Sequence, residues 1–537
     1  MKKYWWSGLA LVTCVACAAA GPAPVDTDAG ASDQTATSEV AADALAGVDA
    51  AQEVAKPAEP VNLLPGEVAE FAVVDGTAAL QLATPQGDEQ FVLVLASARL
   101  DSVGKKFAYQ VGLASDLTAT SQATVVTGCA LTAAPWQAKP PAAEASPEGK
   151  APDVGTTRDF HVGTAKGDEI VPFKVMAVGK GAVVWADVSG AHPAKLDDTF
   201  VKDFLADFDK LILPRARTVF GVESDADKDG HIGLLFTPLT YTTAVAYFTG
   251  CDLQQLAGCG PGNQGEFLYL TPPATIKPPY NTPAAIKEIL AHELSHLVHF
   301  NRKVLRNQGA AWADSSYLIE GIGGFSQDVL GYQSGNLYVA KAGLDKIDEF
   351  GLAETLVDGT QYITNRDGVL RGGSYLFVRW LYDRVGGDTA LPDGTLQGQG
   401  GPALMRALLD DKASAAKTLA GLAKIDDIAM DFYTTLAVTN REDVAGPQAL
   451  NPCFRFAPVV ADPVTKKPRG THVYTTFHGV NKMQGPAMQL LEGADGSLRG
   501  GGVEYLTIKA AVGQGVVGIV LAVDAKANAR LRVARVY

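Results

Sequence analysis

The chain is short of positive charge and of long apolar runs, and both shortages exclude classes of protein. Its 537 residues include 45 lysines and arginines against 59 aspartates and glutamates, a formal net charge of −14. This balance argues against nucleic acid or an anionic membrane surface as the main partner. No transmembrane helix is visible, and no internal repeat of about 20 to 50 residues. The hydrophobic content of 47% is that of an ordinary globular protein.

Histidine is also scarce, with 8 in the whole chain, yet two histidines stand four residues apart. The segment His292-Glu293-Leu294-Ser295-His296 has the pattern H-E-x-x-H. In a chain with so few histidines, an accidental match is expected in roughly 1 in 100 cases. Residues 283–300 begin with proline, lack glycine, and repeat apolar residues at three- and four-residue steps. This pattern predicts a buried or half-buried helix.

On such a helix, His292 and His296 lie on one face, one turn apart, where two imidazoles can hold one Zn²⁺. Glu293 is then placed to take a proton from a zinc-bound water and to pass it to the leaving amine. Metal-assisted hydrolysis is the reaction that this arrangement serves. The alternative is a surface helix with two histidines and a glutamate, which the apolar periodicity disfavours.

A catalytic zinc needs three protein ligands and one open position. A metzincin would have Gly at position 299 and His at 302, whereas this chain has His299 and Arg302. Glu320 is the better candidate, because it opens a second helical pattern over residues 316–330. It follows His296 by 24 residues, which leaves room for one loop and an antiparallel return.

The motif H-E-L-S-H-L-V-H-F-N, followed by Glu-Gly at the start of a helix, resembles the gluzincin metallopeptidases. It most resembles the hyicolysin-like M30 family. The similarity extends over roughly residues 170–440, with an aspartate-rich turn at 220–232, a strand at 265–271 and a helix at 373–386. The resemblance implies a zincin-like catalytic domain with a helical C-terminal lobe. It also implies that zinc is held by His292, His296 and Glu320.

The chain departs from the gluzincin pattern at two places. Gly324 stands where an aspartate would support a ligand histidine, so Gln327 and Asp328 are candidate substitutes. Leu370 and Arg371 stand where some gluzincins have a tyrosine that stabilises the oxyanion. The candidates for that role are Tyr375, Tyr362 and His299. For His299, a packed ring without a catalytic role is the favoured alternative.

Asp225, Asp227 and Asp229 alternate before Gly230, as in the first half of a calcium-binding loop. Oxygen ligands at alternate positions and a glycine turn suit Ca²⁺. The twelfth position is Phe236 instead of glutamate, so the segment is not an EF-hand. An aspartate-rich turn capped by its own side chains is the favoured alternative.

The N-terminus predicts export. Two lysines precede the apolar residues 5–20, which are too short to span a bilayer comfortably. A lipobox-like context at Cys14 or Cys17 favours a bacterial cell-envelope lipoprotein, attached to the membrane through an N-terminal lipid. Cleavage after residues 18–20 would instead give a secreted soluble protein. Residues 21–60 contain no aromatic residue and predict a disordered linker.

Four cysteines remain beyond this segment, an even number that fits an oxidising compartment. Cys251 and Cys259 bracket a short glycine-rich loop, which makes their pairing easy. A disulfide between Cys129 and Cys453 then follows by elimination.

The chain is expected to be α+β, with a signal segment at 1–20, a linker at 21–60 and three ordered regions. Strand patterns fill residues 61–195 and 446–537, and a zincin-like domain occupies residues 196–445. These boundaries predict two flanking β-rich domains. The strand near residues 266–270 is expected to bind substrate by adding it as another strand.

The favoured function is an exported, monomeric zinc metallopeptidase, acting as an endopeptidase on protein or peptide substrates. One alternative is a catalytically inactive, peptidase-like surface lipoprotein or binding module, which the two departures from the gluzincin pattern support. Another is a zinc hydrolase or aminopeptidase that acts on small substrates.

Overall fold

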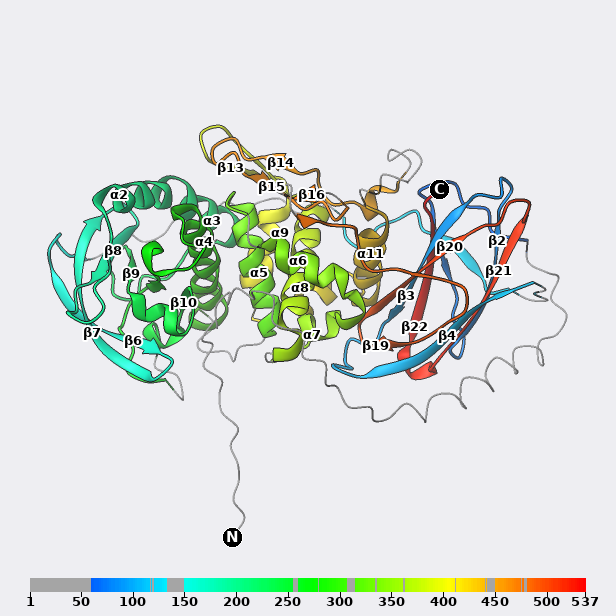
Figure 1. The fold of residues 1–537 in the computed structure, drawn as a ribbon, viewed down its shortest axis with the longest axis horizontal. Helices are drawn as coiled ribbons and strands as arrows, with labels where there is room; N and C mark the ends of the chain where they lie inside the picture. The colour runs from blue at the N-terminus through cyan, green and yellow to red at the C-terminus, as the bar shows by residue number, and fades with distance from the viewer. Residues whose placement is uncertain are drawn as a thin grey trace, which may run out of the picture.

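The computed structural model describes residues 59–537, except 116, 118–119, 133–148, 255–258, 279, 307–313, 334–335, 361–362, 411, 440, 442–449, 475 and 478–480. The fold is mixed α+β, as predicted from the sequence. A β-sheet flanked by helices lies at one end, helices fill the middle and a β-sandwich lies at the other end (Figure 1). The predicted signal segment with Cys14 and Cys17, most of the linker, and Tyr362 fall outside the described residues. None of the helices in the described ranges is long and apolar enough to cross a membrane.

The sheet at one end has six strands in the order β10-β11-β9-β8-β7-β6. They are β6 (Thr157–Thr164), β7 (Gly167–Val178), β8 (Ala182–Asp187), β9 (Ile232–Phe236), β10 (Ala246–Phe248) and β11 (Phe267–Leu270). β11 pairs in parallel with β9 on one side and antiparallel with β10 on the other. The prediction that the 266–270 strand adds a substrate strand is therefore wrong, because its backbone groups already bond two neighbours.

Both faces of this sheet are buried, so the sequences of its central strands are continuous apolar runs. Val184 and Leu234 point into a core shared with the helices, whereas Trp185 and Leu235 point into a second core on the opposite face. The helices of the first face are α2 (Asp198–Asp207), the π-helical turn η1 (Phe208–Ile212), α3 (Leu213–Phe220) and α4 (Pro283–Phe300). One face of the sheet thus packs against α4 in a shared hydrophobic core.

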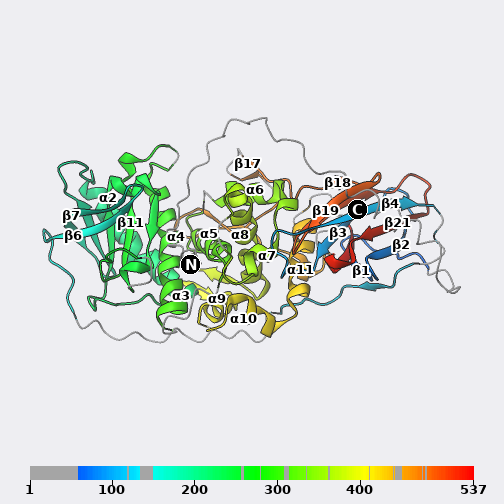
Figure 2. The ribbon, with the colours of Figure 1, turned by 90° about the horizontal axis from the view of Figure 1, so that it is seen from below.

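The middle of the molecule is helical, and α5 packs against both α4 and α8 (Figure 1, Figure 2). Its helices are α5 (Ser316–Val329), α6 (Asn336–Asp345), α7 (Leu352–Leu356), α8 (Asp367–Arg384), α9 (Gly401–Asp410), α10 (Ala415–Leu422) and α11 (Ile425–Val438). Short strands lie beside them: β12 (Asp388–Ala390), β13 (Leu396–Gly398), β14 (Val460–Ala461), β15 (Pro468–Arg469), β16 (Thr476–Phe477) and β17 (Asn481–Lys482). Short helical turns are spread along the whole described chain: η2 (Pro238–Thr242), η3 (Gly250–Asp252), η4 (Pro273–Thr275), η5 (Asn301–Leu305), η6 (Ile347–Glu349), η7 (Thr364–Arg366), η8 (Pro452–Phe454) and η9 (Ala525–Ala527).

Strands from the two ends of the chain build the sandwich together. One sheet has the order β18-β20-β3-β22-β1-β5 and the other β19-β4-β21-β2. The N-terminal strands are β1 (Val68–Phe71), β2 (Thr77–Ala83), β3 (Gln90–Ser97), β4 (Lys106–Ala114) and β5 (Ala123–Val125). The C-terminal strands are β18 (Gln489–Leu490), β19 (Ala494–Arg499), β20 (Val503–Lys509), β21 (Val516–Val523) and β22 (Ala529–Arg535).

This pairing divides the expected β-rich region 61–195 between two sheet systems. β1 to β5 join the C-terminal strands, whereas β6 to β8 join the sheet behind α4. We therefore propose different domain boundaries: strands from both ends of the chain form one sandwich domain, and β6 to β8 belong to the same domain as β9 to β11.

Both predicted disulfides are present. The Cα atoms of Cys251 and Cys259 lie 5.7 Å apart, and those of Cys129 and Cys453 lie 5.1 Å apart. The first closes a short loop after β10, and the second connects the segment after β5 to η8.

Candidate metal centre

The H-E-x-x-H segment lies in the second half of α4. Thr282 caps this helix, since its hydroxyl accepts a hydrogen bond from the amide of Ala285 at 3.2 Å, and Pro283 takes the first helical position. The helix runs between the sheet and the middle helices (Figure 2). The side chains of the motif, His292, Glu293 and His296, are buried. The three side chains therefore face the protein interior, and little of their surface is accessible to bulk water.

Glu320 comes from the second turn of α5 and meets the two histidines. Its Oε2 is 3.3 Å from His292 Nε2, and its Oε1 is 3.9 Å from His296 Nε2. One ligand atom from each of the three residues lies within 4.8 Å of the others. Ligand atoms around a tetrahedral Zn²⁺ are about 3.4 Å apart, so the three side chains fit such an ion after small adjustments.

The close approach of α5 to α4 depends on Gly323. A Cβ atom at this position would lie 2.6 Å from Cε1 and from Nε2 of His292, well inside van der Waals contact. A hydrogen bond also stabilises the contact between α4 and α5: the Ser326 hydroxyl donates to the carbonyl of Ala291 at 2.7 Å. A glycine one turn after Glu320 thus allows the carboxylate to reach the imidazoles.

His296 supplies the observation that points to a cation. Its Nε2 is buried and has no hydrogen-bond partner among the residues that the structure describes. Burial lowers the pKa of His296 to about 3, so the ring is neutral and offers a lone pair. A buried polar atom without a partner is costly, and a bound metal ion would satisfy it.

Glu293 has the properties of a group that exchanges protons. Burial raises the pKa of its carboxyl to about 7, and Oε2 is buried without a hydrogen bond within the described ranges. The backbone of Phe248, the last residue of β10, hydrogen-bonds the carboxylate and favours its charged form. A carboxyl with a pKa near neutrality can both accept and return a proton.

Arg371 on α8 is a residue of the centre to which the sequence assigned no role. Its Nη1 forms an ion pair with Glu320, and its Nε donates to Asp367 at 2.8 Å. Burial alone would raise the pKa of Glu320, but Arg371 and His292 hold it well below its usual range. The only signal in the sequence was its position, where some gluzincins have a tyrosine.

The remaining sequence candidates have other partners. The Tyr375 hydroxyl lies 3.2 Å from Asp328 Oδ2, and Asp328 Oδ1 accepts from the amide of Gly470 at 2.8 Å. The Nε2 atom of His299 lies 3.0 Å from Asp314 Oδ2, which favours the packed-ring interpretation. Gln327 donates to Glu288 at 3.4 Å. The calcium candidates Asp225, Asp227 and Asp229 do meet one another, with oxygens within 4.8 Å.

No protein-family model matches the chain. The chain is similar to a protein of Staphylococcus hyicus named neutral metalloprotease ShpI, with 23% identity over 257 residues. The match covers 45% of this chain and 51% of that protein. The chain therefore spans about half the length of this curated relative.

Proposed function

We propose that this protein is a zinc metallopeptidase of gluzincin type, exported and acting as an endopeptidase. The observation that carries the proposal is the buried meeting of His292, His296 and Glu320 beside Glu293. The similarity to a neutral metalloprotease supports a metallopeptidase. In this proposal the two histidines and Glu320 hold the zinc, and Glu293 is the general base and acid.

When bound, zinc supplies Lewis-acid polarisation of the scissile carbonyl and of a water molecule. Glu293 takes the proton of that water and returns it to the leaving amine, and its pKa of about 7 suits both steps. Arg371 keeps Glu320 ionised and fixes its orientation through the ion pair. Arg371 is thus a positioning residue in this mechanism.

The substrate chain is proposed to lie along β10 instead of β11. β10 is the terminal strand of its sheet in the order that the described residues form, and Phe248 at its end contacts Glu293. An extended peptide that pairs with this strand would pass directly over the general base. This placement suits an endopeptidase that binds residues on both sides of the cleaved bond.

A second candidate is a zinc-binding surface protein without peptidase activity. One observation favours it: within the described part of the chain, the Nδ1 atoms of His292 and His296 have no hydrogen-bond partner. Ligand histidines in zinc enzymes usually donate that hydrogen to a carboxylate or carbonyl.

Replacing Glu293 by glutamine separates these functions, because the amide keeps the shape and removes the base. We expect the variant to keep about one Zn²⁺ per chain. Its hydrolysis of a broad peptide library should fall by roughly 10²–10⁴-fold, the usual contribution of general acid–base catalysis. Metal analysis and library digestion, read by mass spectrometry, measure the two quantities.

The matched controls are His292→Ala and Glu320→Ala, which should lose both zinc and activity. If Glu293→Gln also lost its zinc, Glu293 would be a ligand or a structural residue. If the native protein, fully loaded with zinc, cleaved no peptide of the library, the non-catalytic surface protein would be the better assignment.

A further inference from the structure

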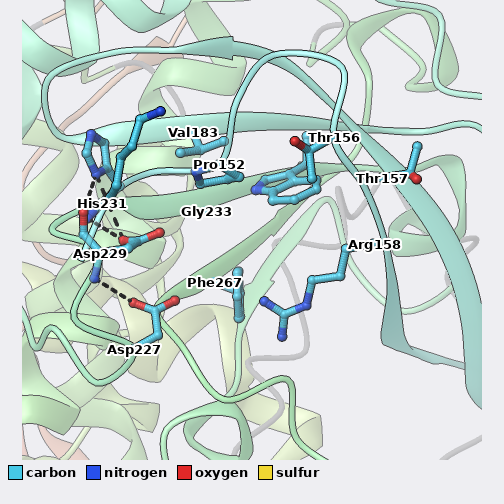
Figure 3. Close-up of a pocket in the computed structure, with 12 residues that line it drawn as sticks. Pro152, Thr156, Thr157, Arg158, Val183, Asp227, Asp229, His231, Gly233 and Phe267 are labelled. Atoms are coloured by element: carbon cyan, nitrogen blue, oxygen red, sulfur yellow. Dashed lines mark hydrogen bonds and ion pairs between the residues drawn. The ribbon is translucent and has the colours of Figure 1, made fainter.

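The candidate metal centre and the cavity in Figure 3 lie on opposite faces of the six-stranded sheet. The cavity has a volume of about 380 Å³, and Trp185 and Phe267 in its wall belong to the core opposite α4. None of the described residues that line it belongs to the metal centre. The groups that hold Glu320 and Arg371 in place therefore come from the middle helices and their neighbours.

The short helix α7 lies on the side of α5 and α8 that faces the sandwich (Figure 1, Figure 2). It packs against the glycine turn, residues 500–502, which connects β19 to β20. The amide of Leu352 donates to the carbonyl of Gly501 at 2.8 Å. Gly501 has a φ of 65°, and a Cβ atom there would lie 2.6 Å from the backbone nitrogen of Ala353. This close approach of the sandwich to α7 therefore requires glycine.

Helix α7 also forms hydrogen bonds with both helices that carry residues of the metal centre. The hydroxyl of Ser315, the N-cap of α5, donates to the carbonyl of Thr355 at 2.7 Å. The hydroxyl of Thr355 lies 2.8 Å from the hydroxyl of Ser374 on α8. On α5 and α8 respectively, Glu320 and Arg371 lie within about two turns of these bonds. A displacement of α7 would therefore move both side chains.

Glu354 of α7 is a buried charge shared by the sandwich and by α8. Its side chain is 0% exposed. Its Oε1 lies 2.8 Å from Nη2 of Arg366, the N-cap of α8, and 3.8 Å from Nη1 of Arg499, the last residue of β19. Its Oε2 is buried and has no hydrogen-bond partner among the described residues. The place of this carboxylate therefore depends on two arginines, one from the sandwich and one from the start of α8.

The contacts continue from Arg366 to the metal centre. Arg366 directly precedes Asp367, which accepts from Arg371 Nε at 2.8 Å. Arg371 in turn forms the ion pair with Glu320. A buried ion pair adds little net stability over apolar side chains of similar size, because both charges lose their hydration. The value of Glu354 at this place is therefore the alignment that it imposes on its two partners.

We propose that Glu354 is a positioning residue, through which the sandwich fixes the spacing of α5 and α8 at the metal centre. This inference rests on the proposed function, in which Glu320 is a zinc ligand and Arg371 orients it. It gives the sandwich a role in the reaction without contact with substrate or metal. The glycine turn and Arg499 hold α7, and α7 holds the two helices.

The test compares Glu354→Gln with Asp431→Asn in the full-length protein. Both substitutions neutralise a buried carboxylate that pairs with an arginine of the sandwich, but Asp431 lies on α11 and pairs with Arg532 at 2.8 Å. Zinc affinity is measured by competition with a chromogenic chelator, and ligand geometry by the visible absorption of the Co²⁺-loaded protein. The constants kcat and KM are determined separately, and every measurement is made well below the unfolding temperature of each variant.

Glu354→Gln should bind zinc roughly 3- to 30-fold more weakly, the usual size of an effect transmitted through a network of contacts. Its Co²⁺ absorption should shift, and its kcat should fall while KM changes less. Asp431→Asn should lower the unfolding temperature and keep the zinc affinity, Co²⁺ absorption and kcat of wild type. If Glu354→Gln fails to fold, Arg499→Met provides the test, because it keeps the pair with Arg366, and Arg499→Lys should restore part of the loss.

The proposal is overturned if Glu354→Gln, or Arg499→Met in its place, lowers only the unfolding temperature. It is also overturned if Asp431→Asn weakens zinc binding equally, since any loss of stability would then loosen the site. A wild-type chain that binds zinc but cleaves no peptide would reject the proposed hydrolysis alone, because zinc affinity and Co²⁺ absorption still test Glu354. A wild-type chain that holds no zinc would overturn both proposals.

Discussion

The balance of charge around the candidate zinc centre is set by single residues. Glu320 and Glu293 are potential anions, His296 is neutral, and Arg371 brings a positive charge into contact with Glu320. Arginine suits this place because its planar fork can bond Glu320 through one nitrogen and Asp367 through another. A lysine has a single ammonium group and cannot hold both carboxylates in the same way.

Arg371→Ala is therefore expected to lower zinc affinity or kcat/KM by roughly 10–100-fold, the usual effect of removing a partner of a metal ligand. Arg371→Lys should recover part of the loss, and Asp367→Asn should have a smaller effect than Arg371→Ala. Zinc affinity is measured by competition with a chromogenic chelator, and kcat and KM are determined separately. Wild-type affinity and kinetics in Arg371→Ala would show that the ion pair only connects α5 to α8.

At the scale of helices, the distance between α4 and α5 decides whether a metal can be held. Gly323→Ala would place a methyl group 2.6 Å from the His292 ring, so the ring or the helix has to move. We expect this variant to fold but to bind zinc at least about tenfold more weakly, since ligand positions must be held closely. The control is Gly368→Ala in α8, where an added Cβ would meet open space. If Gly323→Ala bound zinc like wild type, the helices would not need this close approach.

Local sequence patterns predicted the elements well because each pattern is complete within one segment. Residues 283–300 have a proline start and an uninterrupted apolar periodicity, and α4 spans Pro283–Phe300. The strand expected near residues 266–270 is β11, which spans Phe267–Leu270. The pairing of β11 on both sides could not be predicted, because the neighbours β9 and β10 come from other segments. The contact of Arg371 with Glu320 was missed for the same reason, since the two residues are 51 positions apart.

At the scale of the whole molecule, the sandwich is attached to the helical part by buried charges. Arg532 of β22 forms an ion pair with Asp431 of α11 at 2.8 Å, and Asp431 also accepts from the amide of Ala130 at 2.7 Å. Ala130 stands next to Cys129, so the disulfide to Cys453 reinforces the same junction. The alternation of apolar residues along the strands predicted that sandwich strands exist. It carried no information that the two ends of the chain share a sheet.

The disulfide between Cys129 and Cys453 spans 324 residues, including the sheet behind α4 and the middle helices. Cross-links across long loops restrict the unfolded chain most, and a native disulfide typically contributes about 2–4 kcal/mol. The double variant Cys129→Ser/Cys453→Ser should therefore lower the unfolding temperature by several degrees. Its zinc content and kcat at 25 °C should stay unchanged, because neither cysteine belongs to the candidate metal centre.

Cys251→Ser/Cys259→Ser removes a bond that spans only 8 residues, so its effect through the unfolded state should be smaller. Because that loop follows β10, the second variant is the one expected to impair peptide hydrolysis. The reverse result, with activity lost only when Cys129 and Cys453 are replaced, would mean that the junction with the sandwich governs the site.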